Sequence, residues 1–247
     1  MNSSQRTALV TGSGKNIGRA IVLDFAAKGH NVVINGSRDK QACEKVASEA
    51  EALGAKALVA MGDVGKPEEC ARIAGEALDA FGAVDILVNN AAIRPMTPFL
   101  ELKQEEWDRV ISVDLMSAFH FARACLPGML DKGWGRIVNI AGMNAIQGYN
   151  GRCHVSVAKH GAWGLTKSLA KEFGGRGIST NIVSPGPIAG DHDDPEMAAH
   201  IEAQKAKIPL GRLGLNKEIA AAVSLLASDG GAFINGQMIQ VNGGTQT

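Results

Sequence analysis

A glycine-rich turn near the start of the chain has the residue types and the spacing needed to bind a phosphate group. It runs over Thr11–Gly18 with the sequence TGSGKNIG. The apolar run Thr7–Val10 before it predicts a buried strand, and apolar residues recur at helical spacing after it, over Arg19–Ala26. Glycines let the backbone approach a pyrophosphate closely, and the start of the following helix offers free N–H groups and a positive dipole end. The sequence therefore predicts a dinucleotide-binding turn.

A second polar group follows the next predicted strand, where the adenosine ribose of a bound dinucleotide would lie. This strand ends at Asn35, and Gly36, Ser37 and Arg38 come next. An acidic residue at the end of this strand would bind the ribose hydroxyls and repel a 2′-phosphate. Here Arg38 and Lys15 could instead flank a phosphate, with a hydrogen bond from Ser37. The pattern favours NADP over NAD, and the alternative is that both cations are solvated surface side chains.

The composition restricts the class of protein. The chain has 247 residues with 25 basic and 25 acidic side chains, and this balance gives no reason to expect a nucleic-acid or membrane partner. Its four cysteines lack the spacing of a metal site or a redox pair, and we expect no bound metal. Residues 1–6 lack the apolar core of a signal peptide, and no apolar run is long enough to cross a bilayer. We expect one cytoplasmic domain over residues 1–247.

Strand-like and helix-like segments alternate along the chain, and this alternation indicates how the polar groups are positioned. Strands are expected at Thr7–Val10, Asn31–Asn35, Lys56–Met61, Asp85–Asn89, Arg136–Ile140, Ile178–Val183 and Met238–Val241. Helices are expected after the glycine-rich turn, at about Asp39–Leu53, from Pro67, and at about Gln104–Leu130, His154–Phe173 and Lys217–Ser228. This order implies an α/β fold with one doubly wound parallel sheet, a Rossmann fold of about seven strands. Ligands then bind outside the carboxyl ends of the strands.

The glycine-rich turn resembles the T-G-x-x-x-G-x-G loop of the short-chain dehydrogenase/reductase family. Thr11, Gly12 and Gly18 fit this loop, and Asn16 stands where the middle glycine is usual. Asparagine tolerates left-handed backbone angles better than most residues. Further segments that resemble the family reach from Thr7 to Gly244: Asp63-Val64, Asn89-Asn90-Ala91-Ala92, Ser184-Pro185-Gly186-Pro187-Ile188 and Val241-Asn242-Gly243-Gly244. On these segments the chain is identified as a member of the family.

The resemblance implies a set of cofactor contacts. In the family the aspartate after the third strand bonds the adenine amine, Asn90 would support the central strands, and the Pro-Gly segment lies beside the nicotinamide carboxamide. The predicted cofactor-binding residues are Gly12, Ser13, Lys15, Asn16, Ile17, Gly18, Ser37, Arg38, Asp63, Val64, Asn90, Ala91, Lys159, Pro185, Gly186 and Ile188. The resemblance also implies a lid at about residues 189–209. A homotetramer is expected, because the family pairs its long helices and its C-terminal strand across two-fold axes.

The catalytic groups of the family are mostly replaced. The family reduces carbonyls with a Tyr-x-x-x-Lys pair, a serine thirteen residues before the tyrosine, and an asparagine on the preceding long helix. Alignment on Lys159 places Val155 at the tyrosine position, Gly142 at the serine position and Asp114 at the asparagine position. The only tyrosine, Tyr149, lies ten residues before Lys159. We expect slow reduction of ordinary ketones and a more apolar, roomier pocket beside the nicotinamide.

Three residues remain as candidates for catalysis: Lys159, Asp114 and His154. Lys159 could act through water if burial lowered its pKa, and it should hold the nicotinamide ribose by its charge and reach. Asp114 argues against the water route, because a nearby carboxylate would keep that lysine charged. His154 adjoins the vacant tyrosine position and titrates near neutrality, although on a regular helix it is turned about 100° from Val155. The alternative for His154 is a helix-start residue with a satisfied hydrogen bond.

Other polar residues could bind the substrate. Arg94 and Arg152 lie in loops that should border the pocket, where they could bind a carboxylate or phosphate, and the alternative is that both are solvated. Cys153 carries no sign of activation as a nucleophile. The segment Asp191–Asp194 superficially suggests metal ligands, but Asp194 followed by a proline is typical of a helix start.

Three classes of function follow from these residues. The leading hypothesis is an NADP-dependent oxidoreductase that acts on a small carbonyl or alcohol substrate by an atypical proton route. The second is a non-redox enzyme, a lyase or hydrolase, that reuses the pocket with His154, Asp114 and Lys159. The third is a nucleotide-binding homologue without catalysis, which acts through contacts between subunits.

Overall fold

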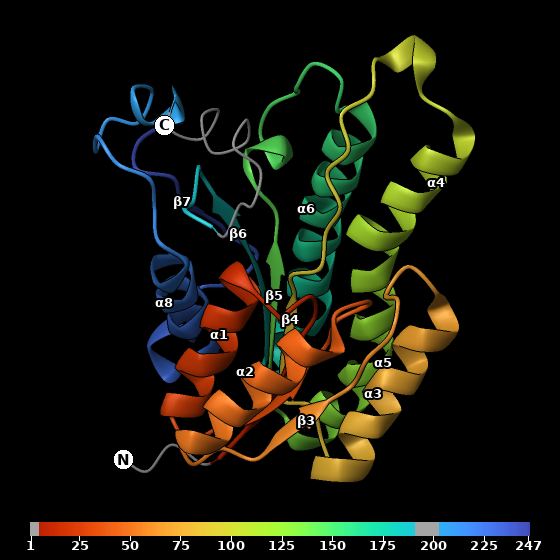
Figure 1. Ribbon diagram of the computed structural model, residues 1–247. Coiled ribbons are helices and arrows are strands. Elements are labelled where there is room, and N and C mark those ends of the chain that lie inside the picture. The colour runs from red at the N-terminus through yellow and green to blue at the C-terminus, as the bar shows by residue number, and fades with distance from the viewer. Residues whose placement is uncertain (1–4, 191–202) are drawn as a thin grey trace.

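The computed structural model describes residues 5–190 and 203–247 and contains one parallel sheet with helices on both faces (Figure 1). The seven strands lie in the order β3-β2-β1-β4-β5-β6-β7. The strands are β1 Thr7–Val10, β2 Asn31–Ile34, β3 Ala57–Val59, β4 Ile86–Asn89, β5 Gly135–Ile140, β6 Ile178–Pro185 and β7 Met238–Val241. The helices are α1 Asn16–Ala27, α2 Lys40–Ala52, α3 Pro67–Phe81, α4 Gln104–Ile111, α5 Ser117–Lys132, α6 Cys153–Phe173 and α8 Asn216–Ala227. The predicted doubly wound Rossmann fold is confirmed.

The core has two halves because side chains alternate across each strand. In β1, Ala8 and Val10 pack with residues of α1, α2 and α8 on one face of the sheet. Leu9 faces the other side and packs with residues of α3 and α5. The strands β1, β2 and β4 are almost entirely buried on both faces, which explains why they are nearly continuous apolar runs in the sequence.

The strand order reverses beside β1, and this reversal determines where a ligand can bind. β1 pairs in parallel with β2 through Val10 and Ile34, and with β4 through Val10 and Val88. The loops that follow β1, β2 and β4 therefore leave the sheet at the same edge. A crevice outside the carboxyl ends of the strands forms at such a switch point.

The helix expected over Gln104–Leu130 is interrupted. Between α4 and α5 the backbone forms a π-helical turn at Ser112–Met116. A π turn adds one residue to a helical turn, and such turns are rare and frequent at functional sites. This turn contains Asp114, which is only 5% exposed. The apolar spacing of the sequence fits a regular helix as well as an interrupted one, so the spacing could not predict this turn.

Two expectations, the possible metal ligands and the lid, concern segments that the structure describes only in part or not at all. The segment Asp191–Asp194 and most of the expected lid lie outside the described residues. The first residues of the expected lid are described, and the backbone N–H of Ala189 donates to Gly214 at 2.8 Å. Among residues 5–190 and 203–247, none of the helices combines the length and the apolar character needed to cross a membrane.

Candidate active site

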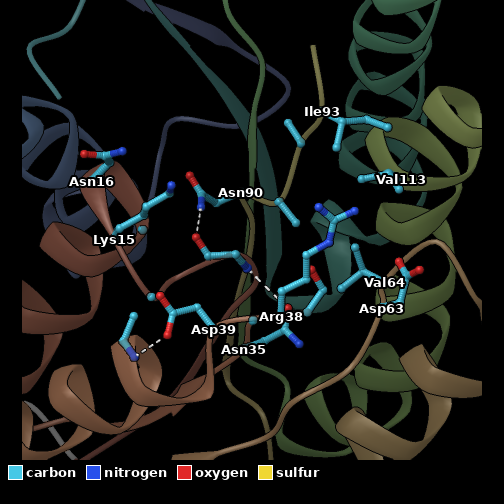
Figure 2. A pocket seen from close by; sticks show the side chains of 18 of the residues that line it. Lys15, Asn16, Asn35, Arg38, Asp39, Asp63, Val64, Asn90, Ile93 and Val113 are labelled. Carbon is cyan, nitrogen blue, oxygen red and sulfur yellow. Dashed lines mark hydrogen bonds between the residues drawn. The ribbon is translucent and has the colours of Figure 1, made fainter. Parts of the chain in front are cut away.

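A cleft of about 440 Å³ lies at the switch point and is lined by loops from the carboxyl ends of β1, β2, β3 and β4 (Figure 2). It brings together eleven of the predicted cofactor residues: Gly12, Lys15, Asn16, Ile17, Gly18, Ser37, Arg38, Asp63, Val64, Asn90 and Ala91. The other five, Ser13, Lys159, Pro185, Gly186 and Ile188, do not line it. Pro185 ends β6, and Ile188 pairs with Gly214. The cleft thus contains the residues expected around the adenosine and the pyrophosphate.

The glycine-rich turn has the geometry that its sequence suggests. Asn16, which replaces the middle glycine, has a φ of 50° and is the only non-glycine residue with a positive φ among the described residues. It adopts the left-handed conformation that a glycine would otherwise supply. Ser13 is fully buried, and its hydroxyl donates to the Val10 carbonyl at 2.8 Å. Ser13 therefore shapes the turn from inside instead of facing a ligand.

Gly18 is the tightest point of this turn, and we expect Gly18→Ala to disrupt it. A methyl group there would lie 2.5 Å from the carbonyl oxygen of Gly12 and 2.7 Å from Nδ2 of Asn90. Overpacking of this kind costs about 1–3 kcal/mol, so thermal unfolding should occur at a lower temperature and NADPH should bind more weakly. The matched control is Gly75→Ala on α3, where a methyl group has no atom within 4 Å. Equal stability and equal NADPH affinity of the Gly18→Ala and Gly75→Ala proteins would contradict this expectation.

Asn35 connects three segments below the cleft. Its Oδ1 accepts a hydrogen bond from the Gly12 backbone at 3.2 Å, and its Nδ2 donates to the carbonyls of Ala60 at 3.0 Å and Gly62 at 3.2 Å. Asn35 is 1% exposed, so its amide is used within the protein. The sequence indicated only that no acid stands at this position, and the connecting role of the asparagine was missed.

Two cations flank the cleft. Lys15 lies on one side and Arg38 on the other (Figure 2), and neither forms an ion pair among the described residues. The nearby acid, Asp39, accepts a hydrogen bond from the Ala42 backbone at 2.9 Å and thereby caps α2. The cleft therefore presents two cations that have no ion-pair partner among the described residues.

Asn90 and Thr11 fix the distance between β4 and the glycine-rich turn. Nδ2 of Asn90 donates to the carbonyls of Thr11 and Gly12, both at 2.9 Å. The Thr11 hydroxyl oxygen accepts from the backbone N–H groups of Asn90 at 2.9 Å and Ala91 at 3.0 Å. These four bonds explain why a threonine precedes the first glycine of the turn. They hold the wall of the cleft in place before any ligand binds.

Asp63, predicted to bind adenine, forms an ion pair with Arg109 of α4 at 2.9 Å. Burial raises the pKa of this carboxyl, but hydrogen bonds from Arg109 and from the Gly65 backbone outweigh burial and hold the pKa below its usual range. Asp63 is therefore ionised at neutral pH and can accept a further hydrogen bond. Arg109 also lines the cleft. Nothing in its local sequence distinguishes Arg109 from an ordinary surface residue of an amphipathic helix.

Lys159, which was predicted to be catalytic, is paired with Asp114, the aspartate at the aligned asparagine position. Nζ of Lys159 lies 3.2 Å from Oδ2 of Asp114 and donates to the Ile140 carbonyl at 3.3 Å. The other carboxylate oxygen of Asp114 accepts from the Ile93 backbone at 2.8 Å. The Asp114 side chain is 0% exposed and the Lys159 side chain is 3% exposed. The π-helical turn thus places a buried ion pair at the junction of β4, β5 and α6.

The roomier pocket expected at the tyrosine position is wrong. Val155 is 0% exposed and packs against Val110, Ala158 and Ile111, so neighbouring side chains fill the space. At the serine position, a side chain on Gly142 would meet no atom within 4 Å. However, Gly142 has a φ of 132° and a ψ of 173°, which only glycine adopts readily. Val155 therefore differs from the family in how it packs, and Gly142 differs in the backbone conformation that it adopts.

Restoring the family residues is consequently expected to harm this protein. Val155→Tyr combined with Gly142→Ser should lower the free energy of unfolding, by about 1–3 kcal/mol for overpacking and a similar amount for the strained backbone. Reduction of an activated ketone should not increase. Urea denaturation and NADPH oxidation measure the two effects. Ser168→Tyr is the matched control, because Ser168 lies on the same helix and is exposed. A stable double variant with faster reduction would show that the pocket can open.

His154 points to α4 and not to the ion pair. Its Nε2 lies 3.1 Å from Oε1 of Glu106, and the same carboxylate oxygen accepts from the Thr97 hydroxyl at 2.7 Å. His154 is 0% exposed. Cys153 lies on another side of α6, beside Tyr149 and His160. The structure therefore brings Lys159 and Asp114 together and leaves His154 in a separate contact.

Comparisons with known proteins agree with this fold. The family described as Enoyl-(Acyl carrier protein) reductase matches residues 12–246. A 3-oxoacyl-[acyl-carrier-protein] reductase FabG of Staphylococcus aureus is 37% identical over 239 residues, which are 97% of each chain. Nodulation protein G of Azospirillum brasilense is 37% identical over 244 residues, which are 98% of each chain. A crystal structure of a putative short-chain alcohol dehydrogenase from Sinorhizobium meliloti 1021 superposes with a TM-score of 0.93 at 30% identity, covering 98% of this chain and 97% of that one.

The chain belongs to the short-chain dehydrogenase/reductase family, a family of oxidoreductases. The family membership that was expected from the glycine-rich turn and the further segments is confirmed.

Proposed function

We propose that the protein is an NADP-dependent oxidoreductase that acts on a small carbonyl or alcohol substrate by an atypical proton route. The observation that supports it most strongly is the cleft with Lys15, Ser37 and Arg38 along its wall. Two cations without an ion-pair partner among the described residues and a hydroxyl donor suit a 2′-phosphate. The position that would carry a repelling carboxylate holds Asn35, whose amide is used inside the protein. NADP, when bound, supplies or accepts the hydride.

The proton must come from a group other than tyrosine. Carbonyl reduction places a hydride on carbon and a proton on oxygen, and Lys159 is the one acid that remains at the aligned catalytic positions. Nζ of Lys159 lies 3.2 Å from Asp114, a carboxylate that competes with the substrate oxygen for its proton. We propose that Lys159 passes this proton to the substrate oxygen directly or through water. A poorly placed general acid forfeits part of the usual contribution of about 10²–10⁴-fold, so turnover should be slow.

Fluorescence titration with NADPH and NADH tests the cofactor, and the loss of NADPH absorbance with a panel of carbonyl compounds tests the reaction. NADPH should bind at least about tenfold tighter than NADH, because even one charge-assisted hydrogen bond to the phosphate has this effect. Equal affinity, or tighter NADH binding, would refute the cofactor assignment. Slow but measurable oxidation of NADPH with at least one carbonyl compound would support the proposed reaction.

A second candidate function is nucleotide binding without redox chemistry. The observation that favours it is the burial of the catalytic centre, where Val155 is 0% exposed and Lys159 is 3% exposed. Tight NADPH binding together with no turnover across the carbonyl panel would select this candidate.

We also propose that the protein is a homotetramer. Its described surface exposes the apolar side chains of Met116, Val157, Leu225 and Phe233, which lie on or beside helices of the kind that the family pairs across two-fold axes. Burial of such side chains between copies of the chain stabilises an oligomer. Static light scattering at micromolar concentration should give four times the chain mass, and a monomer mass would refute the proposal.

A further inference from the structure

Two arginines stand beside the buried ion pair on neighbouring loops. Arg94 follows β4 and lines the cofactor cleft, and Arg152 directly precedes α6. The backbone N–H of Thr97 donates to the Gly151 carbonyl at 2.8 Å, which holds these two loops together. Figure 1 shows the loop after β4 running beside α6. The fold therefore brings two guanidinium groups, which are far apart in the sequence, to one side of the candidate site.

The two arginines affect each other electrostatically. Burial lowers the pKa of Arg94, the positive charge of Arg152 lowers it further, and the negative charge of Asp114 raises it. All three groups therefore lie in one partly desolvated environment. The side chain of Arg94 is nevertheless open to solvent in the cleft, so a small molecule that enters the cleft can reach it.

Two acids on the elements around these loops, Asp114 and Glu106, already have other partners. Asp114 is held by Lys159 and the Ile93 backbone. Glu106 is held by His154 and Thr97. Within residues 5–190 and 203–247, no carboxylate forms an ion pair with Arg94 or Arg152. Because Asp114 is paired with Lys159, neither guanidinium group has an ion-pair partner of its own among the described residues.

We infer that Arg94 and Arg152 bind an anionic group of the substrate, a carboxylate or a phosphate, and so select anionic carbonyl compounds. A guanidinium offers planar pairs of donors that match two oxygens of such a group. Lys15 and Arg38 come from the loops after β1 and β2, whereas Arg94 and Arg152 come from the loops after β4 and before α6, so the two pairs of cations can serve two different ligands. The inference rests on the proposed function, because that function requires the substrate to contain a carbonyl. Binding of the anionic group can be measured without any turnover.

Matched pairs of ligands that differ only in charge test this inference. The NADPH-loaded protein is titrated by calorimetry with pyruvate, acetoacetate and levulinate, each beside its methyl ester, and with dihydroxyacetone phosphate beside dihydroxyacetone. At least one anion should bind ten or more times tighter than its neutral partner. If one of the three carboxylates shows this preference, the site takes a carboxylate; if only dihydroxyacetone phosphate does, it takes a phosphate. Arg94→Gln and Arg152→Gln should each reduce the preference to less than about threefold.

The control is Arg176→Gln, which removes the same charge from an exposed site at the opposite edge of the sheet. It should retain the full preference for the anion. The inference is overturned if no anion binds better than its neutral partner, if both glutamine variants keep the preference, or if Arg94→Gln weakens NADPH binding instead. A clear preference without NADPH oxidation would support the anion site and count against the redox function. Equal oxidation of NADPH by the ester and by the acid would support the redox function and count against the anion site.

Discussion

Replacing Lys159 by methionine is expected to lower the free energy of unfolding by about 3–5 kcal/mol, because it leaves Asp114 as an unpaired buried charge. The Asp114 side chain has no exposure to water, and its remaining hydrogen bond comes from the Ile93 backbone. Methionine keeps most of the length of the lysine side chain, so the change isolates the loss of the ammonium group. Urea denaturation at pH 7, followed by circular dichroism, measures the effect.

Two further variants show whether the buried charge is the cause. Lys159→Met combined with Asp114→Asn removes both charges and should recover most of the lost stability. Lys171→Met removes a lysine from the exposed last turn of the same helix and should change stability by less than about 0.5 kcal/mol. If Lys159→Met were as stable as Lys171→Met, water would have to reach Asp114, and the centre would be more open than the structure shows.

The affinity for NADPH is expected to fall by at least about a hundredfold when Lys15 and Arg38 are both replaced by alanine. Each charge-assisted hydrogen bond to a phosphate contributes about 1.5–3 kcal/mol, and about 1.4 kcal/mol corresponds to a tenfold change in affinity. Affinity for NADH, which lacks the 2′-phosphate, should change by less than about threefold. Fluorescence titration with both cofactors measures the two affinities in the same preparation.

The control variant is Lys45→Ala combined with Lys56→Ala, which removes two exposed cations that do not line the cleft. This control shows how much of any loss of NADPH affinity comes from the lower overall positive charge and not from contacts in the cleft. A similar loss of NADPH and NADH affinity in the Lys15 and Arg38 variant would show that these cations hold the pyrophosphate. In that case the assignment of the 2′-phosphate site would be wrong.

The sequence predicted the fold well because the fold depends on patterns that are local. Apolar strands that alternate with amphipathic helices leave few topologies, and the right-handed crossover rule reduces them further. The left-handed turn at Asn16 was also predictable, because few other residues tolerate that conformation. Most of the residues predicted around the adenosine and the pyrophosphate line one cleft, since the fold brings loops at the carboxyl ends of neighbouring strands together.

The catalytic centre was less predictable because its state depends on packing between distant segments. The replacement of tyrosine by Val155 suggested an empty space, but residues of α4 fill that space. Asp114 was expected to lie near Lys159, yet the π-helical turn that buries it leaves no mark in the apolar spacing. The role of Asn35 was missed because an asparagine at the end of a strand can have many partners, and only the tertiary structure shows which it has.

The hydrogen bonds of Asn35 have a consequence for how cofactor preference could change during evolution. An aspartate here would provide the acid that suits NAD, but its second oxygen would face the carbonyls of Ala60 and Gly62, which now accept hydrogen bonds from the amide at 3.0 and 3.2 Å. The chain would lose two buried bonds and gain repulsion at the same point. A single substitution therefore cannot change the preference without weakening the loop that holds the cofactor. Lineages with this asparagine should retain their cofactor unless the loop after β3 changes as well.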